Sequence, residues 1–515
     1  MPNENPIPKF SIDTLMSQAI WPHKIDHLEL LETHISWVVL TGKFAYKIKK
    51  PVNFGFVNYE SLAKRKHFCD LEIELNRRFA PDLYLGVVPI FQKEDRLQVG
   101  EIAERAGTSA MPVLEYAVKM RQFRQDDILV CHLRHSDLPT EMLDTFAQDI
   151  ADFHRNAESA LPTMACVQPE CIAKEAMDNF VLLEDFFAND IRLEPIKKLK
   201  AWTIKQIDSL LPIFDSRLRQ AKTKRGHGDL HLKNIIYLPD RLQAFDGIEF
   251  NEQLQFVDIL SEIAFPVMDL MARGRRDLGW RLLNAYWESC GDYSGAQVMR
   301  FYLVYRALVR AKVTTLTPQN SSEHERLKHA KGDPSYHQQS GTWDKYLEIA
   351  TFSAFGLSPK IVITHGFSGS GKSTVAMQQI EKEGGVRIRS DVERHRLATK
   401  FKIVKQYSPE MTEWVYAYLN EQARQLVLAG FPVYIDATFL KHEQRLPFEK
   451  LAQELNVGYE ILNCKAEYPE LCERIKQRTN DPSDATLEVL NSQIKSHDPL
   501  TSAELRHTQT VSATS

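Results

Sequence analysis

The chain has 515 residues, too many for one ordinary hydrophobic core, so we expect two or three domains. Its composition, 43% hydrophobic and 26% charged, is typical of a globular protein, and the net charge of −4 excludes a global basic excess for binding nucleic acid. The seven cysteines lack repeated C-x-x-C spacing, and no apolar run approaches the roughly 20 residues of a membrane helix. We therefore expect a cytoplasmic protein with reduced thiols and no membrane partner.

Short strands are expected near the N-terminus, at residues 28–33, 35–40 and 43–50. In the last of these, Ala45, Lys47 and Lys49 share one face because side chains alternate along a strand. A small residue two places before a lysine matches the A-x-K of protein kinases, in which the lysine reaches the phosphates of ATP. We predict this role for Lys47, with Lys49 as the alternative.

A charged helix is expected over residues 59–79, and it offers a carboxylate to hold such a lysine. Glu72 and Glu74 are the candidates, and residues two apart on a helix face different directions, so only one can pair. We predict Glu72, because it fits better relative to Phe79, the apolar residue that closes the helix.

The stretch R-G-H-G-D-L-H-L-K-N-I-I-Y, followed by A-F-D-G-I-E-F, is expected to form a short hairpin with polar groups at both ends. Asp229 precedes Asn234 by five residues, and Asp246 stands where a kinase carries D-F-G. Kinase catalysis needs an Asp for the acceptor hydroxyl, and an Asn and a second Asp for Mg²⁺. We assign Asp229 to the first role, and Asn234 and Asp246 to the metal.

The form H-G-D-x-H-x-x-N resembles the aminoglycoside phosphotransferase and choline kinase families. The segments Y-K-I-K-K-P-V, E-L-N-R-R and P-D-L-Y-L-G-V make the chain similar to bacterial two-domain proteins labelled aminoglycoside phosphotransferase/ATP-binding protein. The resemblance covers residues 25–315 and implies an α+β, protein-kinase-like domain. It does not identify the acceptor.

Residues 314–343 have the composition of a linker, a short helix is expected over residues 346–355, and a second motif follows. An apolar strand at 360–364 leads into G-F-S-G-S-G-K-S-T, and an amphipathic helix follows at 375–380. This P-loop is predicted to cradle phosphate with its backbone N–H groups, Lys372 to reach the β- and γ-phosphates and Ser373 to bind Mg²⁺. The predicted nucleotide-binding residues are Gly366, Phe367, Ser368, Gly369, Ser370, Gly371, Lys372, Ser373 and Thr374.

Acidic residues and arginines follow the P-loop. The element R-S-D-V-E-R, with Asp391 and Arg394, and the later pair Arg474 and Arg478 resemble polynucleotide kinase, zeta toxin and related small-substrate P-loop kinases. The resemblance implies that Asp391 meets the acceptor hydroxyl and that the late arginines brace the transferring phosphate. Asp436 ends a buried strand and is assigned to Mg²⁺. The alternative for Asp391 is a helix N-cap.

We thus expect an α+β kinase-like domain followed by an α/β P-loop domain with a parallel sheet. The expected boundaries are 1–24 for an N-terminal extension, 25–315, a linker at 316–358, and 359–515. Both modules would bind ATP and Mg²⁺ and transfer the γ-phosphoryl group to a hydroxyl of a small molecule or of a nucleic-acid 5′ end. The alternative is a regulatory protein whose P-loop domain senses nucleotide and gates the other module. The oligomeric state stays open.

Overall fold

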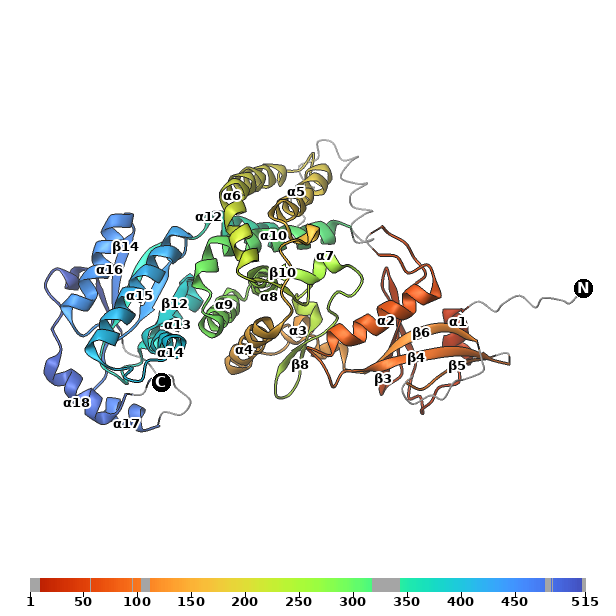
Figure 1. Ribbon diagram of the computed structural model, residues 1–515, viewed down its shortest axis with the longest axis horizontal. Helices are drawn as coiled ribbons and strands as arrows, with labels where there is room; N and C mark the ends of the chain where they lie inside the picture. Colours follow the sequence, from red (N-terminus) through yellow and green to blue (C-terminus); the bar gives the residue numbers. More distant parts are fainter. Residues whose placement is uncertain are drawn as a thin grey trace, which may run out of the picture. The chain divides into compact units, whose positions relative to one another are not determined.

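The structure is a computed structural model that describes residues 10–511 except for 56, 95, 103–111, 317–342, 478–482 and 484. It divides into two compact units, and each is described by itself (Figure 1). The first unit comprises Met1–Met142, Ala157–Ala160 and Thr223–Val257. The second comprises Leu143–Asn156, Leu161–Lys222 and Asp258–Ser515.

A six-stranded antiparallel sheet with the order β1-β2-β3-β6-β4-β5 forms most of the first unit. Its strands are β1 (Glu29–Glu32), β2 (Ser36–Leu40), β3 (Phe44–Lys49), β4 (Tyr84–Lys93), β5 (Arg96–Val99) and β6 (Val113–Arg121). Two helices accompany the sheet, α1 (Ile12–Gln18) and α2 (Leu62–Asn76). The two faces of β3 separate as the alternation predicts: Ala45 packs in a cluster with Cys69 and Ile73 of α2, whereas Tyr46 and Ile48 pack with Leu15 of α1.

The predicted hairpin forms in the first unit, with β8 (Ile235–Tyr237) antiparallel to β9 (Leu242–Ala244). A second small sheet joins β7 (Thr223–Arg225) to β10 (Phe256–Asp258). Two one-turn helices, α3 (Leu129–His132) and α7 (Glu252–Gln255), lie before and after the hairpin in the chain. The catalytic-loop motif therefore lies between short strands that fix both of its ends.

Helices dominate the first half of the second unit. They are α4 (Thr140–Asn156, whose first turn belongs to the first unit), α5 (Pro169–Phe186), α6 (Leu193–Arg219), α8 (Ile259–Ala272), α9 (Arg276–Cys290), α10 (Ala296–Thr315) and α12 (Asp344–Phe355). Every residue of α8 is buried, which makes it the central helix of this group. Helix α8 begins directly after β10, because Asp258 caps it by accepting the N–H of Leu260.

The second half of this unit is a parallel sheet with the order β12-β13-β11-β14-β15, which confirms the predicted α/β fold (Figure 1). Its strands are β11 (Lys360–His365), β12 (Val386–Arg389), β13 (Val433–Asp436), β14 (Gly458–Cys464) and β15 (Thr508–Val511). Its helices are α13 (Lys372–Glu383), α14 (Ser390–Phe401), α15 (Pro409–Leu428), α16 (His442–Leu455), α17 (Tyr468–Gln477) and α18 (Leu487–Ser496). Reasoning from the sequence missed β14 and β15; of these, β15 is a short edge strand with no buried residue.

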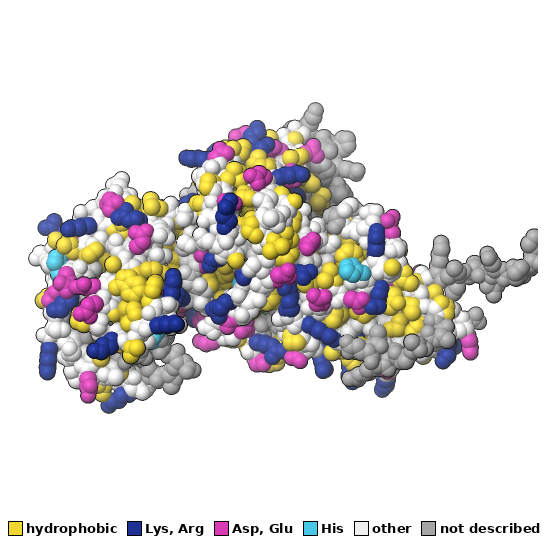
Figure 2. Space-filling model, viewed as in Figure 1, with side chains coloured by type: hydrophobic (Ala, Val, Ile, Leu, Met, Phe, Trp, Pro, Cys, Tyr) yellow, Lys and Arg dark blue, Asp and Glu magenta, His cyan; other side chains and the backbone are white. Residues whose placement is uncertain are grey.

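Charged side chains of both signs are interspersed over the face of the molecule drawn in Figure 2, with apolar patches between them. That face shows no continuous basic stripe, in keeping with the net charge of −4. Among the described residues, no helix combines the length and the apolar character that crossing a bilayer requires.

Candidate active sites

The predicted lysine of the first unit lies in a cluster of charges beneath α2. Lys47 Nζ is 2.8 Å from Glu72 Oε1 and 2.5 Å from Asp246 Oδ1. Glu72 is fully buried, whereas Glu74 is exposed on the other side of the same helix. The structure thus brings together Lys47, Glu72 and Asp246 and leaves Glu74 without a place in the cluster.

Lys49, the alternative lysine, belongs to the same cluster. Its Nζ lies 2.8 Å from Glu72 Oε2 and also contacts Glu249, and the Tyr59 hydroxyl donates to Glu249 Oε1 at 2.7 Å. The sequence analysis missed Glu249. Two lysines two residues apart on one strand lie on the same face, and both need a carboxylate partner when buried. The signal that could have identified the second partner is the Glu of D-G-I-E, three residues after Asp246.

The charges of this cluster hold one another ionised. Burial disfavours the charged form of Lys47, but Asp246 and Glu72 outweigh it, so the pKa of Lys47 lies well above its ordinary value. Burial opposes ionisation of Glu72 as well, yet Lys47 and Lys49 lower its pKa to about 2. At neutral pH the cluster therefore contains ammonium and carboxylate ions, as phosphate binding by a lysine requires.

Hydrogen bonds hold the predicted catalytic loop, residues 229–234, and the start of D-G-I in place. Asn234 Nδ2 donates to the backbone oxygen of Asp229 at 2.9 Å and approaches its Oδ2 at 3.3 Å. The N–H of Phe245 donates to the Asn234 carbonyl at 2.9 Å, which places Asn234 beside the start of D-G-I. Asp246 has a φ of 60°, and its N–H donates to the Tyr84 hydroxyl at 3.0 Å.

Asn76 of α2 holds the next residue of this loop from both sides. Its Oδ1 accepts the N–H of Gly247 at 2.7 Å, and its Nδ2 donates to the Gly247 carbonyl at 3.3 Å. The amide and carboxylate oxygens of Asn234 and Asp246 are ligands that suit Mg²⁺, and they lie at one end of the hairpin. The residues present thus fit the predicted ion.

In the second unit, backbone sterics shape the P-loop. Gly366 has a φ of 147°, and a Cβ there would lie 2.4 Å from the carbonyl of Cys464. Gly369 has a φ of 86°, and its Cβ would lie 2.9 Å from the carbonyl of Leu471. The loop leads into α13 at Lys372, so the N-terminus of that helix faces the place where phosphate is expected.

Side chains tie the P-loop to its surroundings. Lys372 Nζ donates to the Phe367 carbonyl at 2.8 Å. Gln493 of α18 accepts the N–H of Ser368 at 3.0 Å and donates to its hydroxyl at 3.0 Å. Arg474 of α17 donates to the Gly369 carbonyl at 3.4 Å and pairs with Glu470 at 2.6 Å, so it lies beside the loop. Arg478 lies outside the described residues.

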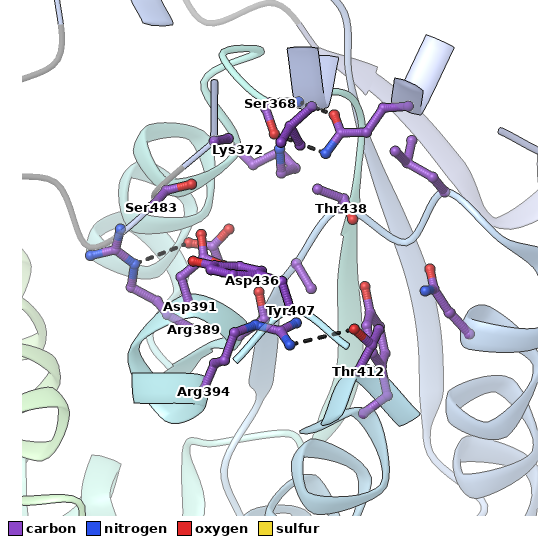
Figure 3. A pocket seen from close by; sticks show the side chains of 18 of the residues that line it. Ser368, Lys372, Arg389, Asp391, Arg394, Tyr407, Thr412, Asp436, Thr438 and Ser483 are labelled. Atoms are coloured by element: carbon purple, nitrogen blue, oxygen red, sulfur yellow. Dashed lines mark hydrogen bonds and ion pairs between the residues drawn. The ribbon is translucent and has the colours of Figure 1, made fainter. Parts of the chain in front are cut away.

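A cavity of about 470 Å³ lies at the carboxyl ends of β11, β12 and β13, where parallel sheets bind ligands. Figure 3 shows its lining. The structure brings six predicted residues to this one cavity, namely Ser368, Lys372, Ser373, Asp391, Arg394 and Asp436. Sequence reasoning missed Arg389, Tyr407 and Thr412, which also line it.

Asp391 does not cap α14. The N-cap is Arg389, and Asp391 lies inside the first turn of the helix and lines the cavity, so the capping alternative is wrong. Arg394 is buried, donates to the Gln406 carbonyl at 2.9 Å and lies 5.1 Å from the centre of the Tyr407 ring. Its Nε is buried and has no hydrogen-bond partner in the part of the chain that the structure describes.

Asp436 at the end of β13 also fits its predicted role. Its Oδ2 is buried and receives no hydrogen bond from the residues that the structure describes, and Arg389 Nε lies 3.6 Å away, too far for a hydrogen bond. A buried carboxylate oxygen without a partner is costly, and a hydrated cation would satisfy it. Together with Ser373 on the same cavity, it fits an Mg²⁺ ion.

Residues 361–500 match the sequence profile of a family described as an AAA domain. Together with the P-loop geometry, this match supports a nucleotide-binding protein of the phosphotransferase type. Over almost its whole length the chain is similar to uncharacterized protein Rv2004c of Mycobacterium tuberculosis, at 28% identity over 471 residues, which covers 90% of this chain and 88% of the relative. The similarity therefore extends over most of both units of this chain.

Solved structures show weaker likenesses. A choline/ethanolamine kinase family protein from Mesorhizobium loti is 9% identical and covers 64% of this chain and 94% of its own, with a TM-score of 0.32. A sugar kinase from Janibacter sp. HTCC2649 is 21% identical and covers 30% and 84%, with a TM-score of 0.24. Likenesses at this level do not identify an acceptor.

Proposed function

We propose that the P-loop module, residues 359–515, is a kinase that transfers the γ-phosphoryl group of ATP to a hydroxyl group. One observation carries the proposal: Lys372 of the P-loop, Asp391 of α14 and Asp436 of β13 line the same cavity of about 470 Å³ (Figure 3). A cavity of this size accepts the end of a nucleotide together with a small acceptor.

Each residue has a distinct part in this reaction. The backbone of the P-loop and Lys372 bind the phosphates, and Ser373 and Asp436 would hold Mg²⁺, which supplies charge neutralisation when bound. Asp391 orients the acceptor hydroxyl and takes its proton late, since phosphoryl transfer has a loose transition state. Arg394 lines the acceptor side, and Arg474 braces the phosphate from the Gly369 side.

We further propose that residues 25–315 form a second, kinase-like module with its own ATP site. Lys47, held by Glu72, would bind the phosphates, Asn234 and Asp246 would hold Mg²⁺, and Asp229 would orient the acceptor. The acceptors of the two modules are a hydroxyl of a small molecule or of a nucleic-acid 5′ end, and the two need not be the same.

One observation favours a regulatory alternative, in which the P-loop domain senses nucleotide and gates the kinase-like module. The P-loop domain does not stand apart from the preceding helices: Asn284 of α9 is buried and donates to the Gly385 carbonyl at 3.0 Å. Turnover separates the two functions, because a sensor hydrolyses ATP slowly and phosphorylates no acceptor.

The test is transfer of label from γ-labelled ATP by the full-length protein to pooled metabolites and to oligonucleotides with free 5′ hydroxyls. With an acceptor found, Asp391→Asn should bind ATP normally and transfer about 10²–10⁴-fold more slowly, the range of a positioned general base. Glu413→Gln, an exposed change on α15, is the control. Normal transfer by Asp391→Asn would refute the assignment of that residue, and slow hydrolysis without any acceptor would favour the sensor.

A further inference from the structure

Helix α9, which precedes the P-loop domain in the chain, pairs with the edge of its sheet. β12 is an edge strand, so its outer backbone groups have no neighbouring strand. Asn284 of α9 supplies the missing partners: its Oδ1 accepts the N–H of Arg387 at 2.6 Å, and its Nδ2 donates to the Gly385 carbonyl at 3.0 Å. This contact lies within the second unit. Helix α9 packs beside α13 and β12 there (Figure 1).

Glu288 lies one turn further along α9 and binds two arginines of this strand. Its Oε2 accepts from Arg387 at 2.9 Å and its Oε1 accepts from Arg389 at 2.9 Å. Burial raises the pKa of Glu288, but the two guanidinium groups outweigh it and hold the pKa below its ordinary value. One carboxylate anion thus fixes two cations that would otherwise repel each other.

Each arginine also approaches a residue that we assign to Mg²⁺ binding. Arg387 Nη1 donates to the backbone carbonyl of Ser373 at 3.1 Å. Arg389 Nε lies 3.6 Å from Asp436 Oδ2, and Figure 3 shows these two side chains pointing toward each other. Arg389 lines the catalytic cavity and also a second cavity of about 560 Å³, which Glu288 lines as well.

We propose that Glu288, on a helix outside the P-loop domain, is a positioning residue for the Mg²⁺–nucleotide site of that domain. The proposal rests on the proposed function only as far as binding of nucleotide with Mg²⁺. Glu288 keeps Arg389 at ion-pair distance from Asp436 but short of a hydrogen bond, so that the carboxylate stays available to a metal ion. Without the charge of Glu288, Arg389 would close on Asp436 and compete with the cation.

The test is the affinity of the full-length protein for a non-hydrolysable ATP analogue with and without Mg²⁺, measured by calorimetry. Subtracting the binding measured for Lys372→Ala from that of wild type gives the nucleotide binding at the P-loop site. In Glu288→Gln, the gain in affinity that Mg²⁺ brings to this site should fall about tenfold, or about 1.4 kcal/mol. Affinity without Mg²⁺ should stay within about twofold of wild type, since no phosphate-binding group is removed.

Glu381→Gln is the matched control, because Glu381 of α13 accepts from Arg281 of α9 at 3.0 Å in the same interface but reaches neither Ser373 nor Asp436. It should leave the effect of Mg²⁺ unchanged. Glu288→Asp should restore part of the effect by restoring the charge, and Arg389→Gln added to Glu288→Gln should restore it too, by removing the competing cation.

Equal Mg²⁺ dependence in Glu288→Gln and Glu381→Gln would overturn the proposal and leave Glu288 as an ordinary interface ion pair. A general loss of nucleotide affinity that the second substitution does not repair would overturn it as well, by pointing to a misfolded interface. Failure of the proposed kinase function would give a different result from failure of this proposal. In that case wild type binds nucleotide and Mg²⁺ but transfers no phosphoryl group, and the Glu288 comparison still stands.

Discussion

The two candidate sites differ in how their charged groups are paired. In the first unit, Lys47 and Lys49 contact Glu72, and further carboxylates complete the cluster. In the second unit, Asp436 Oδ2 and Arg394 Nε are buried and have no hydrogen-bond partner among the described residues. Both line a cavity. The first site is held together by its own ion pairs, whereas the second has buried polar atoms that a bound ligand would satisfy.

This difference predicts how substitutions at the two sites affect stability and ligand binding. A buried, mutually paired cluster holds its lysine extended before ATP arrives, and loss of one partner should harm the fold. Buried groups without partners cost stability in the ligand-free protein and gain contacts on binding. We therefore expect substitutions in the first site to change stability as well as chemistry, and substitutions in the second to change mainly binding and rate.

The largest effect is expected from Asp229→Asn in the kinase-like module. The variant keeps the shape of the side chain and removes the carboxylate that orients the acceptor, so transfer should fall about 10²–10⁴-fold while ATP binding survives. Transfer of γ-label to an acceptor of this module, measured on the full chain, checks it. Asp240→Asn, in the exposed turn of the same hairpin, is the control. Full activity of the Asp229 variant would show that the kinase-loop assignment is wrong.

Glu72→Gln should destabilise the first unit by about 3 kcal/mol, because it leaves Lys47 and Lys49 short of a carboxylate in a buried place. Hydrogen exchange of the α2 backbone amides in the full-length protein measures this locally. Glu74→Gln, on the exposed side of the same helix, should change nothing measurable. Equal exchange in both variants would break the contrast between a self-supporting site and an open one.

This effect should depend on pH with a definite sign. The pKa of Glu72 is lowered in the folded state from 4.5 to about 2, so its stabilisation is fully present above pH 4.5 and is lost as pH falls toward 2. The difference in protection between wild type and Glu72→Gln should therefore shrink over that range. A difference that stays constant down to pH 2 would contradict the ion-pair explanation.

The sequence predicted what depends on local spacing. Period-two alternation placed Lys47 on the face toward α2, and the P-loop pattern located Gly366 and Lys372 between a strand and a helix. Contacts between segments that are distant in the chain could not be predicted from the sequence. Glu249 meets Lys49 only after the chain returns 200 residues later, and nothing near Glu288 marks it as a partner of Arg389. The roles of the predicted site residues remain predictions.

Lys372→Ala should weaken nucleotide binding by the P-loop domain about 100-fold, through loss of charge-assisted hydrogen bonds to the phosphates. The first unit should still bind, since its cluster shares no residue with the P-loop. Titration of the full-length protein should give about two nucleotides per chain and about one in this variant, where the P-loop site no longer saturates. Lys382→Ala, exposed on the same helix, is the control. A single site in wild type would mean that one of the two sites is degenerate.

The smallest effect is expected from Asp246→Asn, and it sharpens the comparison most. The variant weakens a metal ligand, so the Mg²⁺-dependent part of nucleotide affinity in the first unit should fall about tenfold. Asp246 also pairs with Lys47, but Glu72 keeps that lysine in place, so nucleotide affinity without Mg²⁺ should change little. Calorimetry on the Lys372→Ala background isolates this site, with the exposed change Asp82→Asn as control. An equal loss with and without Mg²⁺ would mean that Asp246 serves only to hold Lys47, and the first site would then be a charge cluster without a metal.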